Sequence, residues 1–156
     1  MDHKQYMQEA VTAALKGMQN NEGGPFGCVI VKDGKIIGKG NNKVTSTNDP
    51  TAHAEVTAIR DACKNLGSFQ LEGCTIYTSC EPCPMCLGAI YWARPEKVYY
   101  GSTKTDAAHI GFDDDFIYEE LKLPYADRSI PFEQLAPEVA ITPFQEWATK
   151  EDKTEY

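Results

Sequence analysis

With 156 residues, 42% of them hydrophobic, the chain is long enough to bury one core, and we expect residues 1–156 to form a single domain. The formal net charge is −8 at pH 7, and the excess lies at the end of the chain: residues 105–156 carry −9, against +1 for residues 1–104. Such a surface repels a phosphate backbone, so we expect no nucleic-acid partner and a small neutral substrate instead.

The first helix is predicted over residues 3–18, where apolar side chains recur at helical spacing. Polar residues interrupt every apolar stretch of this segment, which is not the pattern of a signal peptide. No segment of the chain is apolar for long enough to span a membrane. We therefore expect no membrane partner, a cytoplasmic location, and reduced thiols for the six cysteines.

A β-hairpin is predicted after this helix. Residues 26–32 and 35–40 have the composition of strands, and Asp33-Gly34 between them is a strong signal for a two-residue hairpin turn. The next helix is expected to begin near Asp49-Pro50, because aspartate is a good N-cap and proline is favoured at the first helical position. Gly67 is expected to end it.

Helices and strands alternate in the rest of the chain. The expected elements are a strand over 75–79, a helix beginning at Glu81-Pro82, a strand over 97–100, short helices over 106–110 and 116–121, and a last helix opening at Thr142-Pro143. A hairpin followed by alternating helices and strands indicates a layered α/β domain.

Two short motifs in this framework carry the chemistry. His53-Ala54-Glu55 is followed downstream by Pro82-Cys83-Pro84-Met85-Cys86, so that one imidazole, two thiols and one carboxylate recur at fixed spacing. Zinc prefers nitrogen and sulfur ligands in a tetrahedron. We therefore predict that His53, Cys83 and Cys86 hold a zinc ion with one coordination position open. Glu55 is not needed as a ligand and can move protons beside the metal.

The spacing of these residues suggests where the metal lies. Cys83 and Cys86 are three positions apart on one helix and so share a face, and the free N–H groups of a first helical turn stabilise thiolates. His53 and Glu55 are two apart, which would splay them in the middle of a helix. At a helix start both can address one point. We expect the metal between two helix N-termini.

The spacing His-x-Glu and then Pro-Cys-x-x-Cys is the mark of zinc-dependent nucleobase deaminases, and the chain resembles the cytidine-deaminase-like superfamily. The resemblance implies a three-layer α/β/α fold with a mixed five-stranded sheet and one zinc ion per subunit. It also implies that a zinc-activated water attacks the ring carbon bearing the amino group, while Glu55 passes protons to the ring and to the leaving amine.

Within the superfamily, the chain is most similar to the small bacterial guanine deaminases. This resemblance rests on residues 48–60, 78–93, 105–108 and 111–114 and on the terminal Tyr156. It implies hydrolysis of guanine to xanthine and ammonia, a step of guanine catabolism. The substrate-binding residues that it implies are Phe26, Asn42, Ala54, Trp92, Asp114 and Tyr156. On physical grounds a carboxylate such as Asp114 suits the donor groups of guanine, whereas the amide of Asn42 can serve either side.

The C-terminal segment needs a separate explanation. Residues 121–143 contain four prolines, the last of them Pro143, and these favour extended backbone, yet the final helix has an apolar stripe to bury. The resemblance implies that residues 121–156 cross to a second subunit, so that a homodimer forms by exchange of C-terminal elements and Tyr156 closes a pocket.

Three other interpretations stay open. Cys80 is three residues before Cys83 and could complete a His-Cys₃ cage, which would make the chain a structural zinc module without catalysis. Cys83 and Cys86 could instead form a redox pair. The transfer-RNA adenosine deaminases share the Pro-Cys-x-Met-Cys motif, but they bind a polyanion and tend to be basic, whereas this chain is acidic.

Overall fold

The computed structural model describes residues 1–156. The chain divides into two compact units, Met1–Asp115 and Phe116–Tyr156, and each is described by itself.

The first unit opens with helix α1, His3–Gln19, which confirms the helix predicted over 3–18. Its start is fixed by a capping box: the Asp2 carboxylate accepts from the Gln5 backbone N–H, and the Gln5 side chain accepts from the Asp2 backbone N–H. One stripe of the helix is buried, formed by Tyr6, Ala10, Ala14 and Gly17. Helix α1 therefore presents an apolar face to the rest of the unit.

Strands β1, Gly27–Lys32, and β2, Lys35–Asn41, form the predicted antiparallel hairpin. Asp33 and Gly34 both have positive φ angles, 49° and 74°, as a type I′ hairpin turn requires. The two-residue turn predicted at Asp33-Gly34 is therefore confirmed.

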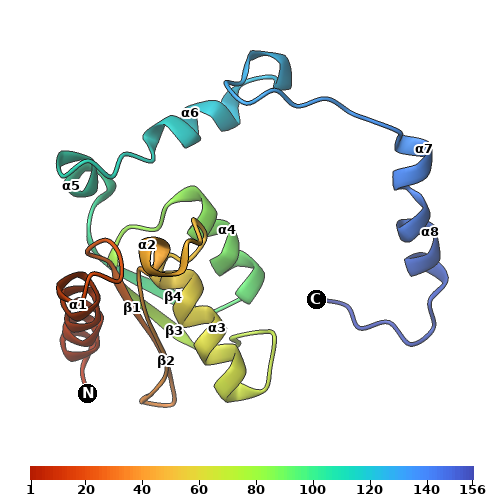
Figure 1. Cartoon of the computed structure of the whole chain (residues 1–156). Coiled ribbons are helices and arrows are strands. Elements are labelled where there is room, and N and C mark those ends of the chain that lie inside the picture. The colour runs from red at the N-terminus through yellow and green to blue at the C-terminus, as the bar shows by residue number, and fades with distance from the viewer. The chain divides into compact units, whose positions relative to one another are not determined.

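Strands β3, Thr75–Cys80, and β4, Lys97–Ser102, complete a mixed four-stranded sheet in the order β2-β1-β3-β4 (Figure 1). Strand β1 is antiparallel to both neighbours, and β3 is parallel to β4. The expectation of five strands is wrong. After β4 the chain forms α5, Lys104–His109, because Thr103 and Asp106 make a capping box that starts a helix where a fifth strand would have to begin.

Helices cover both faces of this sheet. On one face, Tyr6 and Ala10 of α1 pack against Val29 and Val31 of β1 and Tyr77 of β3. The alternate residues of the strands point to the opposite face, as the period of a β-strand requires. There they meet α3, Ala54–Leu66, and α4, Pro84–Ala93.

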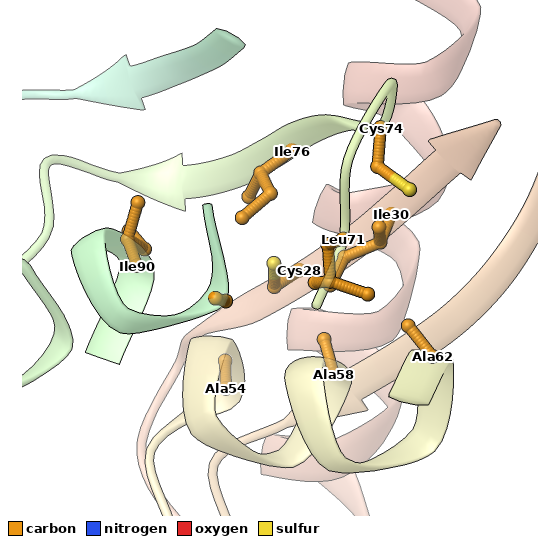
Figure 2. Close-up of a cluster of buried hydrophobic side chains, with 10 residues drawn as sticks. Cys28, Ile30, Ala54, Ala58, Ala62, Leu71, Cys74, Ile76 and Ile90 are labelled. Carbon is orange, nitrogen blue, oxygen red and sulfur yellow. The ribbon is translucent and has the colours of Figure 1, made fainter. Parts of the chain in front are cut away.

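Figure 2 shows the second of these two clusters. Ala54, Ala58 and Ala62 form a row of small side chains along α3 that faces Cys28 and Ile30 of β1. Glycines in β2 let the backbones approach closely: a Cβ added at Gly40 would collide with the Ala54 carbonyl oxygen and lie 2.5 Å from the Ala58 nitrogen. The first turn of α3, which carries one functional motif, is thus held directly against the sheet.

Both motif-bearing helices begin later than the sequence suggested. Asp49 does not cap a helix, because its carboxylate accepts from the backbone N–H and hydroxyl of Thr51 and forms a local turn. That turn follows a short helix, α2, Val44–Thr47, and α3 starts only after His53. Helix α4 starts after Cys83 rather than at Glu81-Pro82.

Helix α6, Asp115–Lys122, begins at the last residue of the first unit and continues into the second. The second unit then contains a 3₁₀ turn, Tyr125–Asp127, and two more helices, α7, Pro137–Ala140, and α8, Thr142–Thr149. The expected helices over 116–121 and from Thr142 are confirmed. No helix in the chain combines the length and apolar character needed to cross a membrane.

Candidate metal and substrate site

The three predicted metal ligands converge in the first unit. His53 is the N-cap of α3, and its backbone is extended rather than helical. The angle that would separate His53 from Glu55 inside a helix therefore does not apply here. Cys83 is the N-cap of α4, and Cys86 lies in the first turn of the same helix. His53 Nδ1 lies 3.5 Å from the Cys83 sulfur and 3.4 Å from the Cys86 sulfur. Two helix N-termini therefore meet at one point.

These separations fit zinc. A tetrahedral ion with bonds of about 2.3 Å to sulfur and about 2.0–2.1 Å to nitrogen holds its nitrogen and sulfur ligands about 3.6 Å apart. The three ligand atoms lie within 4.8 Å of one another, and the group contains no fourth side chain. The donor set of one imidazole and two thiols is also the set that zinc prefers. Such an arrangement leaves one position of the tetrahedron open.

The thiols are prepared for metal binding. Hydrogen bonding from the Cys86 thiol, supported by His53 and the Cys86 backbone N–H, lowers the pKa of Cys83 to about 4, although burial opposes the shift. The same contact with Cys83, together with burial, raises the pKa of Cys86 well above its ordinary value. The hydrogen bond with Cys83 raises the pKa of His53. Zinc binding requires both cysteines as thiolates, so a bound metal would displace any proton that the pair shares.

Cys80 does not join the metal ligands. It is the last residue of β3, and its sulfur lies 3.6 Å from the Thr103 carbonyl oxygen, to which it donates. Burial raises the pKa of its thiol to about 11. The His-Cys₃ cage has no support in this geometry, because the Cys80 sulfur is not among the three ligand atoms that come together.

Glu55 lies beside this cluster in the first turn of α3 and is only 6% exposed. The Thr78 hydroxyl on β3 donates to its Oε1 atom over 2.7 Å. Glu55 also lines the adjoining cavity, together with His53 and Cys83. A carboxylate at this position faces both the metal ligands and the space where a substrate would lie.

The cavity has a volume of about 470 Å³, large enough for a purine base. Phe26, Asn42 and Asp114 line it, which brings three of the predicted substrate-binding residues next to the metal ligands. The Phe26 ring meets the ring of Phe112 edge to face, with centroids 4.9 Å apart. Two aromatic rings thus stand on one wall, which suits a flat heterocycle.

The amide of Asn42 has a defined orientation. Its Oδ1 accepts from the backbone N–H groups of Gly24, at 3.2 Å, and Val44, at 3.1 Å. The amide oxygen is therefore occupied by the protein, and the NH₂ group remains to donate into the cavity. The sequence leaves this orientation open, since an isolated asparagine can serve as donor or acceptor.

Asp114 offers a carboxyl group to the same cavity. Burial raises the pKa of its carboxyl group above the ordinary value, while the neighbouring backbone and Lys104 act in the opposite direction. An ionised carboxylate accepts hydrogen bonds and donates none. The cavity therefore has a donor in Asn42 and an acceptor in Asp114.

The other three predicted substrate-binding residues are placed differently. Ala54 is fully buried and does not line the cavity, but as the first residue of α3 its backbone N–H has no intrahelical acceptor. Trp92 lies on α4 with 64% of its surface exposed and is not part of the cavity lining. Tyr156 ends the second unit and is exposed there.

Sequence reasoning missed two residues of the site, Thr78 and Phe112. Thr78 could have been found from strand periodicity, because it lies two positions after the buried Ile76 and so on the same face of β3. Phe112 precedes the acidic loop and carried no signal of its own, because its role depends on the position of Phe26.

A mixed sheet with two helix N-termini that bring together an imidazole, two thiols and a carboxylate defines a zinc-binding deaminase. The model of the cytidine and deoxycytidylate deaminase zinc-binding region matches residues 1–102. The chain belongs to this family.

The chain is also similar to individual proteins of known activity. The chain is 58% identical to the guanine deaminase of Bacillus subtilis (strain 168) over 156 residues, which is the whole length of both. It also matches the crystal structure of a guanine deaminase from Bacillus subtilis, with a TM-score of 0.97 over all of this chain and 99% of that one. A tRNA-specific adenosine deaminase of the same strain is 44% identical over 97 residues, or 62% of this chain and 60% of that protein.

Proposed function

We propose that this chain catalyses the hydrolytic deamination of guanine to xanthine and ammonia. The observation that carries the proposal is the juxtaposition of Glu55 and the metal-ligand cluster with a purine-sized cavity that has a donor in Asn42 and an acceptor in Asp114. The similarity to a guanine deaminase over the full length of both chains supports the same substrate.

The chemistry follows from the residues. One zinc ion per subunit, held by His53, Cys83 and Cys86, supplies the Lewis acidity that makes water nucleophilic near neutral pH. Glu55 would accept one proton of that water and deliver it to a ring nitrogen as the water oxygen bonds to the carbon. It would then take the remaining proton of that oxygen and pass it to the amino group, so that the carbon–nitrogen bond breaks, ammonia leaves and a carbonyl remains. Water is consumed and ammonia is released, so no further reactant is needed.

Recognition of the base uses both sides of the cavity. The NH₂ group of Asn42 donates to an acceptor of guanine, its carbonyl oxygen or an imidazole nitrogen, and Asp114 accepts from its ring N–H and amino group. Phe26 packs on the face of the ring, and the Ala54 backbone N–H lies at the helix start beside it. A base in which donors and acceptors are exchanged would leave Asn42 and Asp114 unpaired in the complex, which costs affinity.

The second unit is proposed to complete the site in a homodimer. Residues 121–156 would pack on a partner subunit in exchange for the same segment of that partner, and Tyr156 would close a cavity of the dimer. The support is the exposure of its apolar side chains, such as Phe144 and Val139, and of Trp92 on α4. We expect deletion of residues 151–156 to abolish most turnover while zinc content stays at one ion per chain; unchanged turnover would refute this role of the tail.

A cytoplasmic location is part of the proposal. The support is that all six cysteines are free thiols in the structure, as is usual for proteins of a reducing compartment.

A second candidate function is deamination of adenosine in transfer RNA. The 44% identity to a tRNA-specific adenosine deaminase over 97 residues favours it. The charge of the chain opposes it, because residues 105–156 carry a net charge of −9 and would repel a polyanion. A salt-dependent complex with transfer RNA would be the sign of this function.

One experiment separates the candidates. Purified zinc-loaded protein is incubated with guanine, adenine, cytosine, guanosine, adenosine and unmodified transfer RNA, and ammonia release is measured. We expect release from guanine at least an order of magnitude faster than from any other compound. The two polar walls match the donors and acceptors of the guanine ring, and guanosine, which has the same groups, tests whether a sugar is tolerated. Release from transfer RNA without release from guanine would overturn the proposal in favour of the second candidate.

A further inference from the structure

Thr78 is a buried polar residue for which the proposed chemistry has no use so far. The buried polar and charged side chains of the chain are Asn42, Glu55 and Thr78, and Thr78 is the least exposed of them at 1%. Burying a hydroxyl costs free energy unless it forms a hydrogen bond. The Thr78 hydroxyl forms its bond with the carboxylate of Glu55.

Thr78 is fixed to a rigid part of the fold. Strand β3 is an inner strand of the sheet, and Thr78 is paired with Cys28 of β1 on one side and Tyr100 of β4 on the other. Its side chain is β-branched, which restricts its first side-chain torsion. Glu55 belongs to α3, a different layer of the fold. The contact therefore ties the carboxylate of a helix residue to a fixed point of the sheet.

The direction of the hydrogen bond is unambiguous when Glu55 is ionised, because a carboxylate can only accept. The Thr78 Oγ1 atom donates to Oε1 over 2.7 Å, a usual distance for an O–H···O hydrogen bond. A bond to one oxygen restricts rotation of the carboxyl group. The other oxygen is then held in a constant direction while Glu55 lines the cavity.

We propose that Thr78 is a positioning residue: by donating to Oε1, it orients the carboxylate of Glu55 so that the second oxygen faces the reacting atoms of the base. The inference rests on the proposed function, because it assigns Glu55 the proton transfers described above. Thr78 keeps its own proton throughout and touches neither metal nor substrate, so it acts only through Glu55.

The test replaces the hydroxyl at constant shape in the zinc-loaded enzyme. We expect Thr78→Val to lower kcat by about 10-fold to 100-fold, since a misplacement of about 1 Å can cost about 10² in rate. KM should change by less than about threefold, because Thr78 is not part of the cavity lining. Thr78→Ser keeps the hydroxyl and should restore most of kcat. The matched control is Thr75→Val, which removes a hydroxyl from the same strand and should leave kcat unchanged.

A double-mutant cycle separates positioning from a purely structural role. If Thr78 acts through the carboxylate, Thr78→Val should have no further effect on kcat in the Glu55→Gln background. Multiplicative effects of the two substitutions, or failure of Thr78→Ser to restore kcat, would overturn the proposal. An enzyme that deaminates a base other than guanine refutes only the proposed substrate, and the same cycle is run with that base.

Crystal structures of zinc-loaded wild type and Thr78→Val give a readout that does not depend on activity. We expect the Glu55 carboxyl group to rotate or to become disordered in the variant while the metal ligands stay in place. An unchanged Glu55 carboxyl group would refute the inference, even for a protein without activity on any base tested.

Discussion

The carboxylate of Glu55 is 6% exposed and lines the cavity together with His53 and Cys83. Glu55→Gln keeps the size of the side chain and an oxygen that can accept from Thr78. We expect zinc content to stay at one ion per chain and kcat to fall by about 10²–10⁴-fold, the usual contribution of general acid–base catalysis. Metal analysis and ammonia release check both. Full activity of this variant would mean that Glu55 moves no proton.

Cys80 and Cys83 provide a second prediction for single residues. The pKa of Cys80 is raised to about 11 by burial, whereas the pKa of Cys83 is lowered to about 4, chiefly by hydrogen bonding from Cys86. Since the Cys83 sulfur lies with His53 and Cys86 whereas the Cys80 sulfur contacts the Thr103 carbonyl oxygen, Cys80→Ser should keep one zinc ion per chain and Cys83→Ser should lose most of it. Zinc analysis after purification in metal-free buffer tests this. A metal-free Cys80→Ser protein would restore the His-Cys₃ cage as an explanation.

The residues of the metal cluster could be predicted from the sequence because each motif is local. The prediction required a helix start at each motif, and the structure has one at His53 and one at Cys83. The hydrogen-bonding role of Asn42 could not be predicted, because it depends on the backbone N–H of Gly24, which lies in a different loop. Long-range contacts of this kind leave no pattern in a single sequence.

At the scale of elements, the approach of α3 to β2 positions half of the site. Gly40→Ala should lower the free energy of unfolding by about 1–3 kcal/mol, because the added methyl group would collide with the backbone of α3 near Ala54. We also expect kcat to fall in the folded fraction, because the shifted turn carries Glu55. Chemical denaturation and kinetics at 25 °C measure the two effects.

The neighbouring residue of β2 supplies the control. Lys39 is half-exposed and its ion pair with Glu9 lies at the surface, so Lys39→Ala should change the free energy of unfolding by less than about 1 kcal/mol and leave kcat unchanged. Equal losses in the free energy of unfolding for Gly40→Ala and Lys39→Ala would contradict the prediction, because the contact between β2 and α3 would then not account for the effect at Gly40.

The starts of α3 and α4 show where element prediction failed. Asp49-Pro50 has the residue types of a helix start, but the Asp49 side chain forms a turn with Thr51 that satisfies the same carboxylate locally. The cap is instead His53, a residue type with weak capping preference. A residue committed to a metal ion can occupy a cap position that propensity alone would give to Asp or Ser.

For the whole molecule, the layered α/β architecture was predictable because hairpin and helix signals alternate strongly along residues 3–102. The number of strands was not, since the fifth strand came from family resemblance, whereas Thr103 and Asp106 specify a helix at that point. The residues after 115 carried the least information. Their helices are short, and no buried side chain anchors them within the chain.

The division of the chain at Asp115 leads to the last prediction. Both clusters of buried hydrophobic side chains, and all three metal ligands, lie within Met1–Asp115. A protein of residues 1–115 should therefore unfold cooperatively and bind one zinc ion, because the core that holds the two helix N-termini is intact. Its turnover of guanine should be lost if a partner's C-terminal segment completes the cavity. Circular dichroism, zinc analysis and ammonia release test these three points. Loss of zinc binding together with loss of cooperative unfolding would mean that residues 116–156 stabilise the metal centre itself.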